Sequence, residues 1–377
     1  MAAKKTETES KKKTIKHAPG ADLESRLADL GQDVWHTIEG GDSPLIEIPV
    51  RGLSNVSWDK KTNTLKLGEK LLKRNFLNTA HSRKFMQTML VAAYCYKHLL
   101  KPNLHGSQRD LYYALKRTLA NSDENTFDDQ RESDPCIVDL EVTLETLRER
   151  LHVSAAPKGR VVGPATIEDR GDTIRWDKMG SGGWAIPSNV EDIRFKDVSA
   201  DYLLAVEKDA AFERLNEDKF WEKQNCILLT AGGQFSRGAR RIIQRISREH
   251  KLPVYVLTDA DGYGWYIYSV IKFGSMALAH ASTQIATPEA QFIGVTLTDV
   301  EKHGLQKYTI KAEAEDLKRT KEIMQYPWFQ RAEWQKELKK ALETQRKAEI
   351  EALSSKGLQY ITKTYLPQKI ADKDFLP

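Results

Sequence analysis

The sequence predicts an α/β protein of several domains, in which a helical unit precedes a parallel sheet. The sheet is predicted from four compact apolar runs in the second half of the chain, with amphipathic helical stretches between them. These runs are Tyr202–Val206, Cys226–Thr230, Val254–Thr258 and Phe292–Leu297. Because they are continuously rather than alternately apolar, they indicate strands that are buried on both faces, as in a parallel sheet covered by helices.

The composition excludes several classes of protein. The chain has 377 residues and a mean hydropathy of −0.55. It contains no uninterrupted apolar run of about 18 residues, so no membrane-spanning helix is expected, and its N-terminus lacks the apolar core of a secretory signal. The three widely spaced cysteines, Cys95, Cys136 and Cys226, exclude a disulfide scaffold and a cysteine-rich zinc site. We therefore expect a cytoplasmic protein without membrane contact.

The net charge of +5 comes mainly from the N-terminal tail. Residues 1–17 contain six lysines and two glutamates, which leaves the rest of the chain close to neutral. Residues 1–20 are predicted to be a disordered basic tail, which is either a solvated arm or a loose contact with DNA. Elsewhere, any basic surface has to come from local clusters of charge.

Residues 76–163 are predicted to form a winged-helix domain. Apolar periodicity predicts helices over about 82–100, 108–119 and 137–151, and the segments 152–155 and 160–162 are predicted to pair as a hairpin. This is the order of elements in a winged helix-turn-helix, which docks on DNA, although many such domains only contact proteins.

Three further segments complete the predicted organisation. Residues 21–75 are a strand and helix extension, 164–200 a linker, and 201–377 the sheet domain. This last domain is predicted to end in a long amphipathic helix from about Arg331 to Ala352.

Acidic residues follow two of the predicted strands. Glu207 ends the first strand, Asp259 ends the third, and Asp261 comes two residues later. Ligands bind at the carboxyl ends of the strands in an open parallel sheet. Three converging carboxylates repel one another unless a cation neutralises them, and oxygen ligands alone favour Mg²⁺. For any one of these acids, the alternative is that it only caps the next helix.

A glycine turn between these strands opens a helix rich in arginine. The turn spans residues 230–237, and the arginines of the helix are Arg237, Arg240, Arg241 and Arg245. Free amides at a helix start together with arginines form a phosphate-accepting surface, so we expect Arg237 and Arg240 to bind DNA. The chain contains no GxxxxGK[ST] motif and is not expected to hydrolyse ATP alone.

Two adjacent tyrosines lie on the second predicted helix. Its apolar side carries Leu111, Tyr112, Leu115 and Leu119, and the opposite side carries Arg109, Tyr113, Lys116 and Arg117. Neighbouring cations lower the pKa of a phenol and hold a phosphate diester against it, which would make Tyr113 a nucleophile. The alternative is an ordinary surface tyrosine beside cations, Lys116 and Arg117, that contact the DNA backbone.

The run from Arg109 to Tyr113, followed by the strand-end Glu207 and the motif Asp259-x-Asp261, resembles the A subunit of DNA topoisomerase VI and the related meiotic double-strand-break transesterase. The resemblance covers about Ser82 to Asp316. It implies a winged-helix domain followed by a Toprim domain, in which Tyr113 is the nucleophile. It also implies that Glu207, Asp259 and Asp261 bind metal.

The implied activity is that of the DNA-cleaving subunit of an ATP-dependent type II topoisomerase, which relaxes or decatenates DNA. Tyr113 would form a transient 5′-phosphotyrosyl link with double-stranded DNA, assisted by Mg²⁺, and Arg109 would stabilise the phosphoryl charge. Glu207 would be a metal ligand, a general acid or base, or both. The implied partners are a second copy of the chain and an ATP-binding B subunit, in an A2B2 heterotetramer.

Three alternatives remain open from the residues. The chain could be a meiotic-type transesterase, which differs from the topoisomerase by its partner. It could be a Toprim nuclease in which water attacks with the help of Mg²⁺ and Tyr113 is incidental. It could also be a winged-helix DNA-binding protein without catalytic activity.

Overall fold

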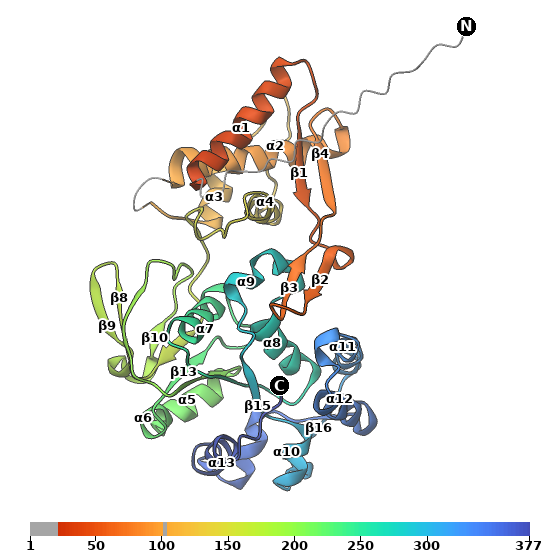
Figure 1. Ribbon diagram of the computed structural model, residues 1–377. Helices are drawn as coiled ribbons and strands as arrows, with labels where there is room; N and C mark the ends of the chain where they lie inside the picture. The colour runs from red at the N-terminus through yellow and green to blue at the C-terminus, as the bar shows by residue number, and fades with distance from the viewer. Residues whose placement is uncertain (1–21, 101–103) are drawn as a thin grey trace. The chain divides into compact units, whose positions relative to one another are not determined.

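The computed structural model describes residues 22–100 and 104–377, so the predicted basic tail lies outside the described residues. The chain forms two compact units, each with its own core (Figure 1). The N-terminal unit comprises the described residues up to Ile48 together with Lys73–Val153. The sheet unit comprises Pro49–Leu72 and Ser154–Pro377.

The N-terminal unit is mainly helical. Its helices are α1 (Leu23–Glu39), α2 (Thr79–Tyr94), α3 (Gln108–Leu115) and α4 (Gln130–Thr143). Strand β1 (Leu45–Pro49) pairs with β4 (Leu71–Asn75), and β5 (Gly106–Ser107) pairs with β6 (Val153–Ser154). Fully buried side chains from three of these helices, Val91, Leu111 and Ile137, belong to one core cluster.

All three predicted helices of this unit exist, but their bounds differ from the prediction. Helix α2 begins three residues early because the Asn78 side chain accepts a hydrogen bond from the Ala80 N–H, 2.9 Å away. Helix α3 ends at Leu115, since Lys116 has an extended backbone. Helix α4 begins at Gln130 rather than 137 because Asp129 caps it. Its first turns are polar, and apolar periodicity could not detect them.

The predicted hairpin of the winged helix is wrong. Its first half, β6, pairs with β5 at the start of α3. Its second half, β7 (Arg160–Val162), belongs to the sheet unit, where it pairs antiparallel with β10 (Trp184–Ala185) and β13 (Cys226–Thr230). The three apolar or amphipathic residues of β7 fit either pairing, so the local pattern could not decide between them.

The predicted linker at 164–200 is also wrong. Strands β8 (Ala165–Asp169), β9 (Asp172–Arg175) and β11 (Arg194–Val198) form a three-stranded antiparallel sheet in the order β11-β8-β9. Trp176 is fully buried beside it and contacts the rings of Trp184 and Phe195. The region is therefore a folded sheet, and Gly171 forms the tight turn between β8 and β9.

The predicted parallel sheet is confirmed. Strands β12 (Tyr202–Val206), β13 (Cys226–Thr230), β14 (Val254–Leu257) and β15 (Gln291–Gly294) are parallel, in a six-stranded sheet of order β10-β7-β13-β12-β14-β15. Helices α5 (Asp209–Glu217) and α6 (Phe220–Lys223) lie on one side and α7 (Arg237–Glu249) and α8 (Gly262–Phe273) on the other (Figure 1). Every residue of β12 and β13 is buried, as their unbroken apolar runs predicted.

Shorter elements complete the sheet unit. They are β2 (Val56–Asp59), β3 (Thr64–Leu67), α9 (Ser282–Ile285), α10 (Leu297–Lys302), β16 (Ile310–Lys311), α11 (Ala314–Met324), α12 (Ala332–Thr344), β17 (Arg346–Lys347) and α13 (Leu366–Ala371). The predicted long C-terminal helix is therefore too long, because Gln345 takes a left-handed conformation that ends α12. Within the part of the chain that the structure describes, no helix combines the length and apolarity needed to span a membrane.

Gly264, near the start of α8, is needed for close packing beside the strand-end acids. A Cβ added there would lie in hard contact with the Asp259 carbonyl oxygen and 2.8 Å from the Thr258 hydroxyl. We expect Gly264→Ala to destabilise the chain by about 2 kcal/mol through overpacking, measured by denaturant unfolding. Gly31→Ala is the control, because that helical glycine has nothing within 4 Å of an added Cβ; an equal loss of stability in both variants would contradict the packing argument.

Candidate active site

Helix α3 separates the two adjacent tyrosines, as predicted. The helix is fixed at its start by a reciprocal pair of hydrogen bonds between Ser107 and Asp110, in which each side chain accepts from the backbone N–H of the other residue. Tyr112 is 7% exposed, whereas Tyr113 is 62% exposed. The predicted division of the helix into an apolar side and an open side is confirmed for these two residues.

The hydroxyl of Tyr112 is already engaged within the N-terminal unit. It donates a hydrogen bond to the Asp128 carbonyl oxygen, 2.8 Å away, and accepts one from the Lys116 ammonium at 3.1 Å. A phenol in this position cannot approach a DNA phosphate, so Tyr113 is the one of the pair whose hydroxyl is accessible.

The predicted group of three cations around Tyr113 is only partly present. Arg109 is exposed on α3, one turn before Tyr113. The predicted continuation of the helix to 119 is wrong, because α3 ends at Leu115 and Lys116 and Arg117 lie beyond it. The Lys116 ammonium contacts the Tyr112 hydroxyl, which is the main cause of the raised pKa of Lys116, and the nearby Tyr113 contributes to the same shift. The Arg117 backbone pairs with Thr126. The side chains of Lys116 and Arg117 remain exposed, so DNA contact by them stays a prediction.

The strand-end acids of the sheet unit come together. Strands β12 and β14 are adjacent and parallel, so the residues that follow them meet at the same edge of the sheet. The Asp259 N–H donates to a Glu207 carboxylate oxygen at 3.0 Å, and the Glu207 N–H donates to the Leu257 carbonyl at 2.9 Å. The glycine turn supports the same residue, because the Gly233 N–H donates to the Glu207 carbonyl oxygen at 2.8 Å.

Asp261 has the helix-capping role that was the alternative for these acids. One of its carboxylate oxygens accepts hydrogen bonds from the N–H groups of Tyr263 and Gly264, at 2.9 and 2.8 Å. Capping occupies only this oxygen. The second oxygen accepts no hydrogen bond from the described residues, so capping does not exclude metal binding.

The pKa values of all three strand-end acids are raised, in each case mainly by burial. Burial raises the pKa of Glu207 to about 7, and the charges of Asp259 and Asp261 add to this effect. Burial, with a further contribution from Asp261, raises the pKa of Asp259 to about 6. The pKa of Asp261 is raised by burial and by the nearby Asp316. These shifts show that negative charge is concentrated here, which a bound cation would relieve.

The chemistry of this group fits a hard divalent cation. Its members offer only carboxylate oxygens, which Mg²⁺ prefers, and they are largely buried. As they stand, however, residues 22–100 and 104–377 include no group of three or more His, Cys, Asp or Glu side chains that could enclose a metal ion. One Asp259 oxygen pairs with the Lys208 ammonium at 3.0 Å, and the other accepts from the Ile350 N–H at 2.8 Å. Metal binding therefore requires these side chains to rearrange.

A C-terminal segment beside the acids was missed by the sequence analysis. Ala348 pairs with Ala260 by backbone hydrogen bonds, which brings residues 346–351 alongside the Asp259-x-Asp261 motif. The Lys347 ammonium lies 2.7 Å from Asp316, the acid that neighbours Asp261. These contacts join positions far apart in the chain, and no local motif indicates them.

Most arginines of α7 are buried or paired with acids rather than gathered on an open surface, and DNA contact by Arg237 stays a prediction. Arg240 is 4% exposed, so the prediction that it contacts DNA is contradicted by its burial. Arg241 pairs with both oxygens of Glu191, at 2.6 and 2.9 Å, and Arg245 pairs with Glu249 at 2.7 Å. Arg237 is half-buried at the helix start. These side chains mainly fasten α7 to its surroundings.

Comparison with known proteins identifies the family. The chain is 44% identical over 362 residues to the type 2 DNA topoisomerase 6 A subunit of Pyrococcus abyssi, covering 93% of this chain and 94% of the relative. It is 43% identical to the corresponding protein of Hyperthermus butylicus, covering 94% and 97%. The chain belongs to the topoisomerase VI A-subunit family. It is also 36% identical to the DNA topoisomerase 6 A3 subunit of Oryza sativa, covering 94% of this chain and 79% of that protein.

Three family models match successive parts of this topoisomerase VI A-type chain. Residues 83–153 match a type IIB DNA topoisomerase model, 158–199 an all-beta domain of the DNA topoisomerase VI alpha subunit, and 202–370 the Toprim domain shared by the topoisomerase 6 A-type proteins and Spo11. The first contains Tyr113 and the third contains all three strand-end acids. The predicted family, the predicted activity as DNA-cleaving subunit of a type II topoisomerase and the predicted Toprim fold are confirmed.

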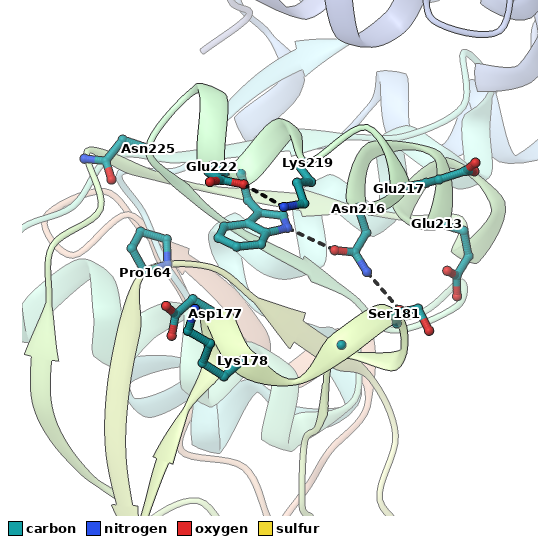
Figure 2. Close-up of a pocket in the computed structure, with 12 residues that line it drawn as sticks. Pro164, Asp177, Lys178, Ser181, Glu213, Asn216, Glu217, Lys219, Glu222 and Asn225 are labelled. Atoms are coloured by element: carbon teal, nitrogen blue, oxygen red, sulfur yellow. Dashed lines mark hydrogen bonds and ion pairs between the residues drawn. The ribbon is translucent and has the colours of Figure 1, made fainter.

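A pocket in the sheet unit of this topoisomerase VI A-type chain lies away from the Toprim acids. It measures about 680 Å³, and Asn225, which lines it, immediately precedes β13 (Figure 2). The pocket therefore borders the amino end of a strand, whereas ligands of parallel sheets bind at the carboxyl ends. Its polar groups are satisfied within the chain: the Trp221 indole donates to Asn216 at 3.0 Å, and Lys219 pairs with Glu222 at 3.3 Å. We assign it no chemistry.

Proposed function

We propose that this chain cleaves double-stranded DNA through Tyr113, with Mg²⁺ held by Glu207, Asp259 and Asp261. The observation that carries the proposal is the contrast between two neighbouring phenols on α3. Tyr112 is buried and hydrogen-bonded, whereas Tyr113 is 62% exposed beside Arg109. Tyr113 is therefore the accessible phenol of the pair, and it stands at the position where the family resemblance implies the nucleophile.

The cleavage step is a transesterification. The Tyr113 oxygen attacks a backbone phosphorus, a bond between that oxygen and phosphorus forms, and the bond from phosphorus to the 3′-oxygen breaks. The phenol loses its proton and the leaving 3′-oxygen gains one. The product is a 5′-phosphotyrosyl link that keeps the phosphate ester for resealing. Arg109, one helical turn away, stabilises the negative charge on the phosphoryl oxygens.

The Toprim acids support this step in two ways. Glu207, Asp259 and Asp261 would hold the Mg²⁺ ion, which supplies electrostatic stabilisation of the phosphate and the leaving oxygen when it is bound. Glu207 is also suited to move a proton, because burial brings its pKa to about 7, close to the working pH. A proton held by Glu207 can pass to the 3′-oxygen as that oxygen leaves.

The assembly follows from the reaction. A double-strand break needs two nucleophiles, so the active form contains two copies of this chain, with the tyrosine of one protomer acting beside the acids of the other. Strand passage needs ATP, and the chain carries no phosphate-binding motif of its own. An ATP-binding B subunit therefore completes an A2B2 heterotetramer. The three cysteines are buried and free, which fits action on DNA in a reducing cytoplasm.

Trapping the covalent adduct tests this proposal. The chain is mixed with its B subunit, supercoiled DNA, Mg²⁺ and ATP, the reaction is stopped with detergent, and the adducted peptide is mapped by mass spectrometry. We expect a nucleotide attached through its 5′-phosphate to Tyr113, and no adduct when EDTA removes Mg²⁺. Cleaved DNA without any protein adduct would instead support the nuclease alternative, in which water attacks.

A further inference from the structure

Lys208 carries the cation nearest to the Toprim acids. It directly follows Glu207, and its ammonium lies 3.0 Å from Asp259, 3.3 Å from Glu349 and 2.9 Å from Glu351. The lysine side chain is only 26% exposed and that of Asp259 only 10%, so solvent screens this pair weakly. The Lys208 ammonium thus contacts Oδ2 of Asp259, whereas Oδ1 accepts the hydrogen bond from the Ile350 N–H.

The segment from Glu349 to Glu351 holds this arrangement in place. The Ile350 N–H donates to one Asp259 oxygen at 2.8 Å, while the two flanking glutamates bind the lysine that pairs with the other oxygen. Asp259 therefore has both oxygens engaged before any ion arrives. Burial opposes the charge on Lys208, but the charge of Asp259 and the hydrogen bond to Glu351 outweigh this and raise its pKa, so it is a cation at neutral pH.

We propose that Lys208 competes with the divalent cation for Asp259 and thereby lowers the affinity of the Toprim site for the ion. This inference rests on the proposed metal-binding role of Asp259. An ammonium and a divalent ion bound to the same carboxylate repel each other, and a partly buried site screens this repulsion weakly. Binding of the ion therefore favours displacement of Lys208 from Asp259, and Lys208 can keep its contacts with Glu349 and Glu351.

The same contacts define what Lys208 does in the chain without metal. It neutralises one of three mutually repelling carboxylates, and so it keeps the strand-end acids together in the absence of an ion. Lys208 is thus a positioning residue: it holds the acids together without metal, and it lowers the affinity of the site for the ion. A purely structural lysine would not alter metal affinity in this direction, because its removal would loosen the site and weaken binding.

Mn²⁺ binding to the full chain without DNA tests the inference. The free-ion signal is followed by electron paramagnetic resonance at pH 7.5 for wild type, Lys208→Met and Lys208→Gln, with folding verified by circular dichroism. We expect the folded neutral variants to bind Mn²⁺ about tenfold more tightly than wild type. Lys208→Arg keeps the positive charge and should keep the wild-type affinity.

Lys302→Met is the matched control, because Lys302 also pairs with a carboxylate of the same unit, Asp374, at 3.3 Å, but not with a Toprim acid. It should leave Mn²⁺ affinity unchanged, which separates a local effect from net charge. Suppose that Asp259→Asn, introduced into the otherwise wild-type chain, abolishes Mn²⁺ binding. Unchanged or weaker Mn²⁺ binding by the neutral Lys208 variants would then overturn only the role of Lys208. Mn²⁺ binding that survives Asp259→Asn would overturn the proposed metal site itself.

Discussion

Tyr113→Phe is expected to abolish the covalent DNA adduct and to lower DNA relaxation by more than about a thousandfold, because the substitution removes the oxygen that we propose attacks phosphorus. The side chain is 62% exposed on α3, so loss of its hydroxyl removes no buried hydrogen bond and the fold should be unaffected. Relaxation of supercoiled DNA is measured with the B subunit, ATP and Mg²⁺, alongside adduct formation.

Tyr112→Phe is the matched control for this substitution. It removes the same atom from the neighbouring residue, where the hydroxyl donates to the Asp128 carbonyl and accepts from Lys116. We expect a loss of about 1 kcal/mol in stability and retention of the adduct. If Tyr113→Phe still cleaved DNA and Tyr112→Phe did not, the nucleophile would be misassigned; if both cleaved DNA without an adduct, water would be the nucleophile.

The different fates of the two tyrosines show what helical periodicity could predict. The apolar residues at Leu111 and Leu115 defined the buried side of α3, and this correctly separated Tyr112 from Tyr113. The same periodicity was extended too far, to 119. The backbone turns extended at Lys116, and no strong helix-stop residue such as glycine or proline marks that point. The side chains around the phenol were therefore harder to predict than the phenol itself.

The Toprim strands were predictable because each one is marked by its own unbroken apolar run in the sequence. An unbroken apolar run such as Tyr202–Val206 has to be buried on both faces, and the acid after it has to lie at the carboxyl edge. β7 carries no such signal. Its three residues, Arg160–Val162, become a strand only by pairing with β13, which is more than sixty positions away, and a short segment does not reveal its partner.

The contacts of Asp259 illustrate the same limit at the site. The motif Asp259-x-Asp261 indicated the acids, but nothing local indicated that residues 348–351 would run beside them. That placement depends on the end of α12 at Gln345, where a left-handed residue turns the chain back toward the sheet. The local sequence therefore reveals the acids but not the contacts of Lys208 and Ile350, which hold Asp259.

Glu207→Gln is expected to have opposite effects on activity and on stability. It removes the group that we propose as a metal ligand and proton donor, so cleavage of DNA should fall by about 10²- to 10⁴-fold. In EDTA at pH 8, however, the free energy of unfolding should rise, by up to about 3 kcal/mol. Burial and the charge of Asp259 raise the pKa of Glu207 from 4.5 to about 7, so an ionised Glu207 destabilises the metal-free chain.

The pH dependence fixes the sign of this second effect. Between about pH 4.5 and 7 the folded chain keeps a proton on Glu207 that the unfolded chain releases, so stability is present at low pH and is lost as the pH rises through this range. Denaturant unfolding in EDTA from pH 5 to 8 should show a shallower decline for Glu207→Gln than for wild type. Glu343→Gln, an exposed glutamate on α12, should leave the decline unchanged. A variant less stable than wild type at pH 8, with an unaltered decline, would mean that Glu207 is stabilised in the fold and that no cation is needed to relieve its charge.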